Sequence, residues 1–165
     1  MEGESGNLRR GDTHGPICPV ECSSNEGETR DLKPRLLLDT HVLVRWLTEV
    51  RRLSRDQARM LRQAVARGDL LGVSASSLTE IAVLFGTGNR RSHVSAEELF
   101  ASFELGAGFH IVPIDLEVAR EVAALGDSLR DPADRVIVAT ARVHGLRLVT
   151  SDQRIIASKL VSVVE

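Results

Sequence analysis

The stretch that decides the fold of this chain begins Leu36-Leu37-Leu38-Asp39-Thr40-His41-Val42-Leu43 and continues to Leu47. Three leucines in a row are typical of a strand that is buried on both faces. From Asp39 onward, apolar residues recur at helical spacing, with Val42, Leu43 and Trp46 at three, four and seven positions after it. The stretch therefore predicts a buried strand that runs through an aspartate directly into a helix.

Further along the chain, short apolar runs alternate with helical patterns. Runs that predict strands lie at residues 70–74, 109–114, 146–149 and 160–164. Helical patterns lie at residues 54–67, 76–85, 95–106, 115–126 and 131–144, and a short one begins at residue 152. Strands that alternate with helices are typical of a parallel sheet covered by helices on both faces. We therefore predict an α/β fold.

The composition of the chain changes at about residue 34. Residues 1–34 are rich in Gly, Ser and Glu and contain no aromatic residue, so they cannot bury enough surface to offset their ordering entropy. We predict a disordered N-terminal extension over residues 1–34 and one folded domain over residues 35–165. The extension holds His14, Cys18 and Cys22, but this set lacks a fourth ligand and zinc-finger spacing, so we do not expect a zinc site there.

Several classes of protein are excluded by composition. No apolar stretch approaches the roughly 18 residues of a membrane span, and the first thirty residues show no secretory signal. Both cysteines precede residue 35, so the folded domain has no disulfide framework, which favours a cytoplasmic location. Aromatic residues make up only 3 % of the chain, so we do not expect nucleic acid to be held by base stacking.

Four acidic residues stand where an α/β fold places its ligands. Asp39 and Asp152 each follow a predicted strand, Asp134 lies in the first turn of a helix, and Glu80 interrupts an otherwise apolar helix. Ligands collect outside the carboxyl ends of the strands in such sheets. Carboxylates on apolar helix faces repel one another, and a divalent cation removes that penalty. Because the donors are hard oxygens, the set predicts Mg²⁺ or Mn²⁺.

Each acid also has a structural alternative. Asp39 and Asp152 are suited to cap the helices that follow them, and Asp131, which precedes a proline, is a standard helix opening. Asp134 could interact with the dipole of its helix, and Glu80 could lie on a solvated strip. The functional interpretation therefore depends on the joint arrangement of the acids.

Four segments, taken in order, carry a resemblance to a known family. They are Leu37-Leu38-Asp39-Thr40-His41-Val42-Leu43, Val73-Ser74-Ala75-Ser76-Ser77-Leu78-Thr79-Glu80-Ile81-Ala82, Arg130-Asp131-Pro132-Ala133-Asp134-Arg135-Val136-Ile137-Val138-Ala139 and Leu148-Val149-Thr150-Ser151-Asp152. Together they resemble the PIN-domain family, and within it the VapC-type toxins of bacterial type II toxin–antitoxin modules. The resemblance covers about residues 35–165 and implies a three-layer α/β/α sandwich with a central, mainly parallel sheet of four to five strands.

The resemblance also implies a function. It implies a divalent-metal-dependent endoribonuclease that hydrolyses RNA phosphodiester bonds and serves as the toxin of a toxin–antitoxin module. The family's catalytic acids fall on Asp39, Glu80, Asp134 and Asp152, and we expect Asp39, Asp134 and Asp152 to hold Mg²⁺ (or Mn²⁺). Auxiliary candidates are Asp131, Thr40, Ser151 and Arg135. The implied partners are an RNA substrate, a cognate antitoxin and a second copy of the chain in a homodimer.

The contact surface for RNA stays open at this level. Arg55, Arg59 and Arg62 share one face of the helix over residues 54–67, and Arg90 and Arg91 lie in a loop. Such a face is either simply solvated or in contact with RNA or with an antitoxin.

Other functions fit the sequence less well. A PIN-type nuclease of RNA processing without a toxin role is the main alternative, and a non-catalytic PIN-like module that binds RNA or protein is a second. A phosphatase of the haloacid dehalogenase kind needs an aspartate two positions after its nucleophile, and His41 stands there. A nucleotide-binding module is disfavoured because no glycine-rich phosphate loop is present.

Overall fold

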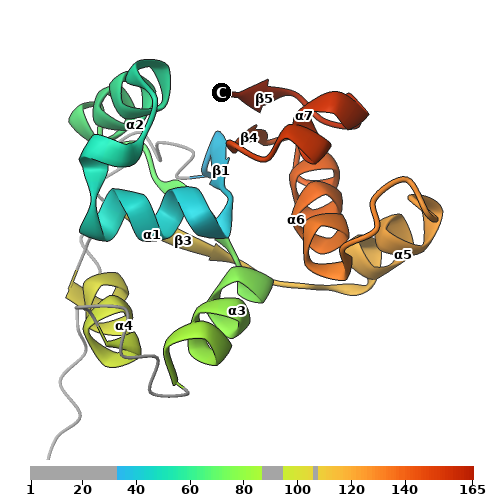
Figure 1. Ribbon diagram of the computed structural model, residues 1–165, viewed down its shortest axis with the longest axis horizontal. Coiled ribbons are helices and arrows are strands. Elements are labelled where there is room, and N and C mark those ends of the chain that lie inside the picture. Colours follow the sequence, from blue (N-terminus) through green and yellow to red (C-terminus); the bar gives the residue numbers. More distant parts are fainter. Residues whose placement is uncertain (1–32, 87–94, 106–107) are drawn as a thin grey trace, which may run out of the picture. The chain divides into compact units, whose positions relative to one another are not determined.

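The computed structural model of the chain describes residues 33–86, 95–105 and 108–165. Its strands are β1 (Leu36–Leu38), β2 (Leu71–Ser74), β3 (Phe109–Val112), β4 (Arg147–Val149) and β5 (Val163–Val164). They form one sheet in the order β3-β2-β1-β4-β5, and every neighbouring pair is parallel (Figure 1). The prediction of a mainly parallel sheet of four to five strands is confirmed.

Helices occupy most of the connections between these strands. They are α1 (Thr40–Thr48), α2 (Arg55–Ala66), α3 (Ala75–Gly86), α4 (Ala96–Leu105), α5 (Leu116–Ala124), α6 (Pro132–Val143) and α7 (Gln153–Ser158), with a short 3-10 helix η1 (Val50–Arg52) after α1. Across the described ranges, none of them is both long and apolar enough to cross a membrane.

Two hydrophobic clusters, one on each face of the sheet, make this a three-layer structure. Leu36 and Leu38 belong to the cluster that α1, α2, α3 and α4 cover, whereas Leu37 belongs to the cluster under α5, α6 and α7. Successive strand residues point to opposite faces, so a run of leucines buries both faces at once. In Figure 1 the two sets of helices lie on opposite sides of the strands. The predicted α/β/α sandwich is confirmed.

The strand order fixes where a ligand would sit. From β1 the chain steps outward to β2 and β3 and then returns to the other side of β1 as β4 and β5. The reversal lies between β1 and β4, whose register pairs Leu38 with Val149. Ligands bind at such a switch point, outside the carboxyl ends of the strands. The residues that follow β1 and β4 therefore meet at the edge where a site is expected.

The predicted starts of α2 and α4 are confirmed. Ser54 forms a capping box with Gln57 at the start of α2, and Ser95 does the same with Glu98, whose Oε2 accepts from the Ser95 N–H at 2.7 Å. That hydrogen bond holds the pKa of Glu98 below its ordinary value. Each cap satisfies amide groups that a helix start leaves without partners.

Two strands are shorter than predicted by two residues or more, whereas β2 and β4 each begin one residue later than predicted. β3 ends at Val112 instead of residue 114, and the residue that follows is Pro113, which has no N–H to donate to a neighbouring strand. β5 covers only Val163–Val164 instead of residues 160–164. There Lys159 ends α7 in the left-handed conformation, with φ at 53°, and the chain needs the next residues to turn back toward the sheet.

Gly72 gives a prediction about stability. A Cβ atom at this position of β2 would lie 2.8 Å from the backbone oxygen of Leu36 on β1. Because that oxygen belongs to a paired strand, it cannot move aside, and we expect Gly72→Ala to lower the free energy of unfolding by about 1–3 kcal/mol. Gly108→Ala is the matched control, since a Cβ there meets nothing within 4 Å. Urea unfolding of both variants checks this, and equal stabilities would contradict it.

Candidate active site

Asp39 joins β1 to α1 at the switch point, and its side chain does not cap the helix. Its backbone N–H donates to the carbonyl of Val149 at 3.1 Å, which continues the pairing of β1 with β4. The residue is only 6 % exposed, and no hydrogen bond links its carboxylate to the first turn of α1. Oδ2 instead accepts from the hydroxyl of Thr150 at 2.6 Å. The capping alternative for Asp39 is therefore not what the structure contains.

Thr150, which sequence reasoning missed, links two of the predicted acids. It is fully buried after β4, where its Oγ1 donates to Asp39 and accepts from the backbone N–H of Asp152 at 3.0 Å. Gln57, also buried, donates from Nε2 to the carbonyl of Thr150 and to Oγ of Ser151 at 3.0 and 3.1 Å. A threonine two positions before a helix-capping aspartate was the available signal, because its hydroxyl can bond to that backbone.

Asp152 both caps α7 and carries an ion pair. Its Oδ1 accepts from the backbone N–H of Arg154 at 2.8 Å, so the predicted capping role is real. Its Oδ2 also lies 2.6 Å from Nη2 of Arg154. The hydrogen bond from the Arg154 side chain, with those from backbone N–H groups, holds the pKa of Asp152 below its ordinary value.

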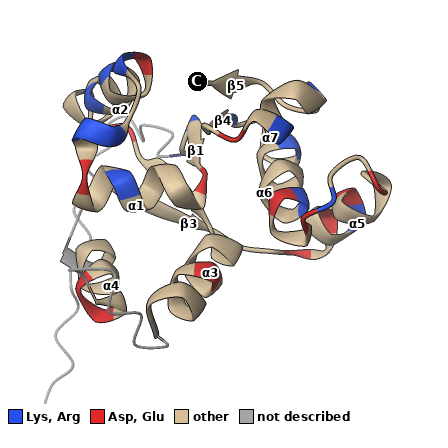
Figure 2. Cartoon of the chain, viewed as in Figure 1, with Lys and Arg blue, Asp and Glu red and all other residues tan. Residues whose placement is uncertain are grey.

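Asp134 is the aspartate whose pKa the fold raises. It lies in the first turn of α6, its side chain is 15 % exposed, and burial raises its pKa to about 6. The charges of Asp131, Asp152 and Asp39 raise that pKa further, while Arg154 lowers it. The charges that act on Asp134 thus come from three separate segments of the chain. Figure 2 shows acidic residues in red at the β1–α1 and β4–α7 junctions and at the start of α6.

Glu80 lies beside this group through Thr40. The Thr40 hydroxyl, which is buried, donates to Oε2 of Glu80 at 2.7 Å and so joins α1 to α3. Glu80 itself is half-buried. Its contact to this group is therefore indirect, through Thr40, the residue that follows Asp39 in the chain.

The auxiliary candidates Asp131 and Arg135 form hydrogen bonds to backbone groups. Asp131 caps α6, with Oδ1 accepting from the N–H of Ala133 at 2.9 Å. Arg135 donates from Nη1 to the carbonyl of Gly126 at 3.1 Å, and within the described ranges no carboxylate lies within 4 Å of its guanidinium. The alternative in which Arg135 pairs with an acid is therefore not observed.

Some residues that the sequence analysis names lie outside the described residues. They are the loop arginines Arg90 and Arg91 and the residues His14, Cys18 and Cys22.

A cleft of about 190 Å³ opens over the aspartates. It is lined by Asp39, His41, Arg45, Ser151 and Asp152. His41 and Arg45 were not picked out as site residues by the sequence analysis, although their i, i+4 spacing places both on one face of α1. The cleft therefore brings the carboxylates of Asp39 and Asp152 together with a histidine and an arginine.

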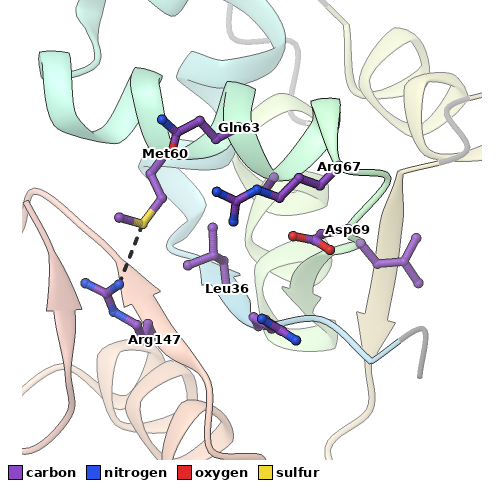
Figure 3. Close-up of a pocket in the computed structure, with 9 residues that line it drawn as sticks. Leu36, Met60, Gln63, Arg67, Asp69 and Arg147 are labelled. Atoms are coloured by element: carbon purple, nitrogen blue, oxygen red, sulfur yellow. Dashed lines mark hydrogen bonds between the residues drawn. The ribbon is translucent and has the colours of Figure 1, made fainter. Parts of the chain in front are cut away.

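A larger cavity of about 320 Å³ lies at the other end of the sheet. It is lined by Arg35, which precedes β1, by Arg147, which begins β4, and by Arg67 and Asp69 after α2. In Figure 3 the Arg147 side chain reaches toward the sulfur of Met60, to which its Nη1 donates at 3.9 Å. With one carboxylate among three guanidinium groups, this cavity lacks the donors that a divalent cation needs.

Whether the aspartates suit a metal ion can be judged from their donors. The cluster offers only carboxylate oxygens, which are the ligands of Mg²⁺ and Mn²⁺, and the raised pKa of Asp134 marks a site where added positive charge is favourable. As they stand, no three His, Cys, Asp or Glu side chains of the described residues are close enough together to hold an ion. Two of the carboxylates are turned to Arg154. The donor set fits a metal, and a rotation of these side chains is needed to assemble it.

Comparison with known proteins gives the family. The PIN-domain family model matches residues 36–159. Ribonuclease VapC22 of Mycobacterium tuberculosis is 39 % identical over 121 residues, which are 73 % of this chain and 88 % of that protein.

Solved structures share the fold. The crystal structure of VapBC2 from Rickettsia felis, bound to a DNA fragment from its promoter, matches 78 % of this chain and 96 % of its own at a TM-score of 0.60 and 14 % identity. The crystal structure of FitAcB from Neisseria gonorrhoeae matches 79 % and 96 % at a TM-score of 0.59 and 23 % identity. At these identities the likeness concerns the fold alone. The family model and the 39 % identical relative show that the chain belongs to the PIN-domain family and is a homologue of VapC-type ribonucleases.

Proposed function

We propose that this protein hydrolyses RNA phosphodiester bonds with the help of a divalent metal ion. The observation that carries the proposal is the buried carboxylate of Asp39, which is held by Thr150 toward the β4–α7 turn instead of capping its own helix. Burying a carboxylate costs free energy unless a positive charge or hydrogen bonds compensate for the water that it loses. The family match and the relative named as a ribonuclease support the same activity.

The proposed roles follow from the positions of the acids. Asp39, Asp134 and Asp152 would hold Mg²⁺ or Mn²⁺, with Asp131 at the margin of the group. A bound ion lowers the pKa of water and neutralises charge that develops on a phosphate. We propose that Glu80, whose Oε2 accepts from the Thr40 hydroxyl, orients the attacking water or a second ion. By analogy with the family, hydrolysis leaves a 5′-phosphate and a 3′-hydroxyl.

RNA would approach over the cleft. His41 and Arg45 line it together with Ser151, and we propose that these side chains contact the backbone of the substrate, since phosphates supply most contacts to nucleic acid. Arg55, Arg59 and Arg62 are exposed on α2, and Arg59 pairs with Asp56 at 2.9 Å. That pairing favours a solvated surface for this helix face.

The biological setting is part of the proposal. The fold neighbours include complexes of toxins with antitoxins, and on that basis we propose that this chain is a toxin that acts on cytoplasmic RNA and is restrained by a cognate antitoxin. A homodimer is proposed by analogy with the family. Expression with and without the adjacent gene tests the toxin role, because growth arrest that the neighbour does not relieve would favour a nuclease of RNA processing.

The chemical activity is tested directly with purified protein. We expect RNA to be cut in Mg²⁺ or Mn²⁺ and not in a chelator, and the new ends to carry a 5′-phosphate that a 5′-monophosphate-dependent exonuclease recognises. Binding of RNA without cleavage in any divalent metal would instead support the non-catalytic alternative.

Thr150 provides a test of how the site is held. Thr150→Val keeps the volume of the side chain but removes the hydroxyl that bonds to Asp39 and Asp152. We expect cleavage to fall roughly 10- to 100-fold, the usual cost of losing a group that orients a metal ligand. Thr140→Val is the matched control, because Thr140 is equally buried but its hydroxyl bonds to the backbone of α6. Equal cleavage rates for the two variants would contradict this role.

A further inference from the structure

Arg154 makes contacts that none of the proposed roles uses. It lies in α7, and its guanidinium meets Asp152 twice, with Nε at 3.2 Å from Oδ1 and Nη2 at 2.6 Å from Oδ2. The same Nη2 lies 3.4 Å from Oδ2 of Asp134 on α6. One nitrogen is thus shared between two carboxylates that come from different elements.

No other cation in the described part of the chain is placed in this way. Arg135 donates to a backbone carbonyl, Arg142 pairs with Glu121, and neither forms an ion pair with the aspartate group. Arg45 lines the cleft without an ion pair in the described residues. Arg154 is therefore the guanidinium that offsets the mutual repulsion of Asp134 and Asp152.

The contacts of Arg154 have little structural value beyond the aspartates themselves. Its side chain is 64 % exposed, so the contacts bury little apolar surface. Water screens the exposed guanidinium, so what Arg154 contributes to stability is the countercharge that it supplies to Asp134 and Asp152. An exposed side chain is also free to swing out, since solvent lies on its other side.

The oxygens that Arg154 holds are the ones a metal ion needs. Both oxygens of Asp152 and one of Asp134 accept from it or pair with it. A Mg²⁺ ion sits about 2.1 Å from its ligand oxygens, and a guanidinium that keeps its contacts to the same oxygens is repelled by that ion at close range. The two cations therefore exclude each other, which agrees with the finding that no three carboxylates of the described residues are gathered for an ion as they stand.

We propose that Arg154 is a built-in competitor of the divalent metal: it occupies Asp134 and Asp152, and the metal must displace it to enter the site. This rests on the proposed function, because it concerns the affinity of that metal centre. Arg154 thus sets the metal concentration at which the site fills. It is a positioning residue that acts through two aspartates, not a group that touches the reacting atoms.

The test measures Mn²⁺ binding to the purified full-length protein by calorimetry and by the electron paramagnetic resonance signal of free Mn²⁺. We expect Arg154→Gln to bind Mn²⁺ at least five-fold more tightly than the unmodified protein. Arg154→Lys keeps the charge but loses the bidentate contact to Asp152, so we expect its affinity for Mn²⁺ to lie between those of the unmodified protein and Arg154→Gln. Arg147→Gln is the matched control, because it removes the same charge at the other end of β4, and its affinity should stay within two-fold.

A second readout is thermal stability in a chelator. There Arg154→Gln should unfold at a lower temperature than Arg147→Gln, because it leaves Asp134 and Asp152 without their countercharge, and added Mn²⁺ should restore more stability to it than to the control. Unchanged or weaker Mn²⁺ binding in Arg154→Gln would overturn the proposal.

The outcomes also separate this inference from the proposed function. If the unmodified protein and Arg154→Gln bind Mn²⁺ equally, the competitor role fails and the metal centre stands. If neither binds Mn²⁺, the metal centre itself fails and the inference falls with it. Adding Asp39→Asn to Arg154→Gln should abolish the tighter binding, and retention of that binding would place the ion elsewhere and overturn the inference.

Discussion

Asp39→Asn is expected to lower RNA cleavage by a factor on the order of 10² or more, which is the usual effect of removing one charged group from a site that stabilises a phosphate transition state. Asparagine has the size of aspartate and can still accept from the Thr150 hydroxyl, which lies 2.6 Å from Oδ2. The fold should therefore survive, whereas the negative charge that a metal ion needs is lost. Single-turnover cleavage of a labelled RNA in Mg²⁺ measures the effect.

Asp115→Asn is the matched control for this variant. Asp115 also stands between a strand and a helix, but its side chain caps α5 by accepting from the N–H of Val118 at 2.9 Å. Asparagine caps a helix about as well as aspartate, so neither activity nor stability should change. If Asp39→Asn folds normally and cleaves RNA at the unmodified rate, the assignment of the site is wrong.

Asp134→Asn is expected to stabilise the protein in a chelator at pH 8 while cleavage is lost. The folded protein raises the pKa of Asp134 from 3.8 to about 6, chiefly through burial. A carboxyl group whose pKa is raised favours the folded state most when it is protonated, and this stability is lost as the pH rises from about 4 through 6. Two pKa units correspond to about 3 kcal/mol as an upper bound, and asparagine avoids this cost because it carries no charge.

Urea unfolding in a chelator at a series of pH values checks this prediction. At pH 8, Asp134→Asn should raise the free energy of unfolding by about 1–3 kcal/mol, a range that allows for the loss of the favourable interaction between Asp134 and the helix dipole. This increase should shrink toward zero near pH 4. Asp127→Asn, at an exposed position, should change the free energy of unfolding by less than about 0.5 kcal/mol. A variant at position 134 that is less stable than the unmodified protein at pH 8 would contradict the argument.

Sequence reasoning succeeded where the physical cause is local. The three leucines of β1, the serine caps of α2 and α4 and the aspartate caps of α5, α6 and α7 depend on neighbours within a few residues. The same reasoning erred by a few residues at the end of β3 and at the start of β5, where pairing with a neighbouring strand and the turn after the left-handed Lys159 decide the bounds.

The site shows where that reasoning stops. Sequence reasoning selected Ser151 and Arg135 as auxiliary residues. In the structure, the hydroxyl that bonds to Asp39 belongs to Thr150, and the guanidinium that pairs with the aspartates belongs to Arg154. Thr150 and Asp39 are 111 positions apart, and no local pattern reports which of two adjacent hydroxyls points inward. That choice is made by the pairing of β1 with β4, which aligns Leu38 with Val149 and leaves Asp39 beside Thr150.

The sequence by itself determined the α/β class, the alternation of strands and helices and which acids stand at strand ends and helix starts, because apolar periodicity and helix capping act over short distances along the chain. Only the tertiary structure decided that Asp39 leaves its cap position to meet Thr150, that Asp134 is buried enough for its pKa to rise to about 6, and that Arg154 bridges two aspartates. The physical reason is that burial and charge–charge interaction depend on distances through space, which are set when parallel strands bring remote segments to one edge of the sheet.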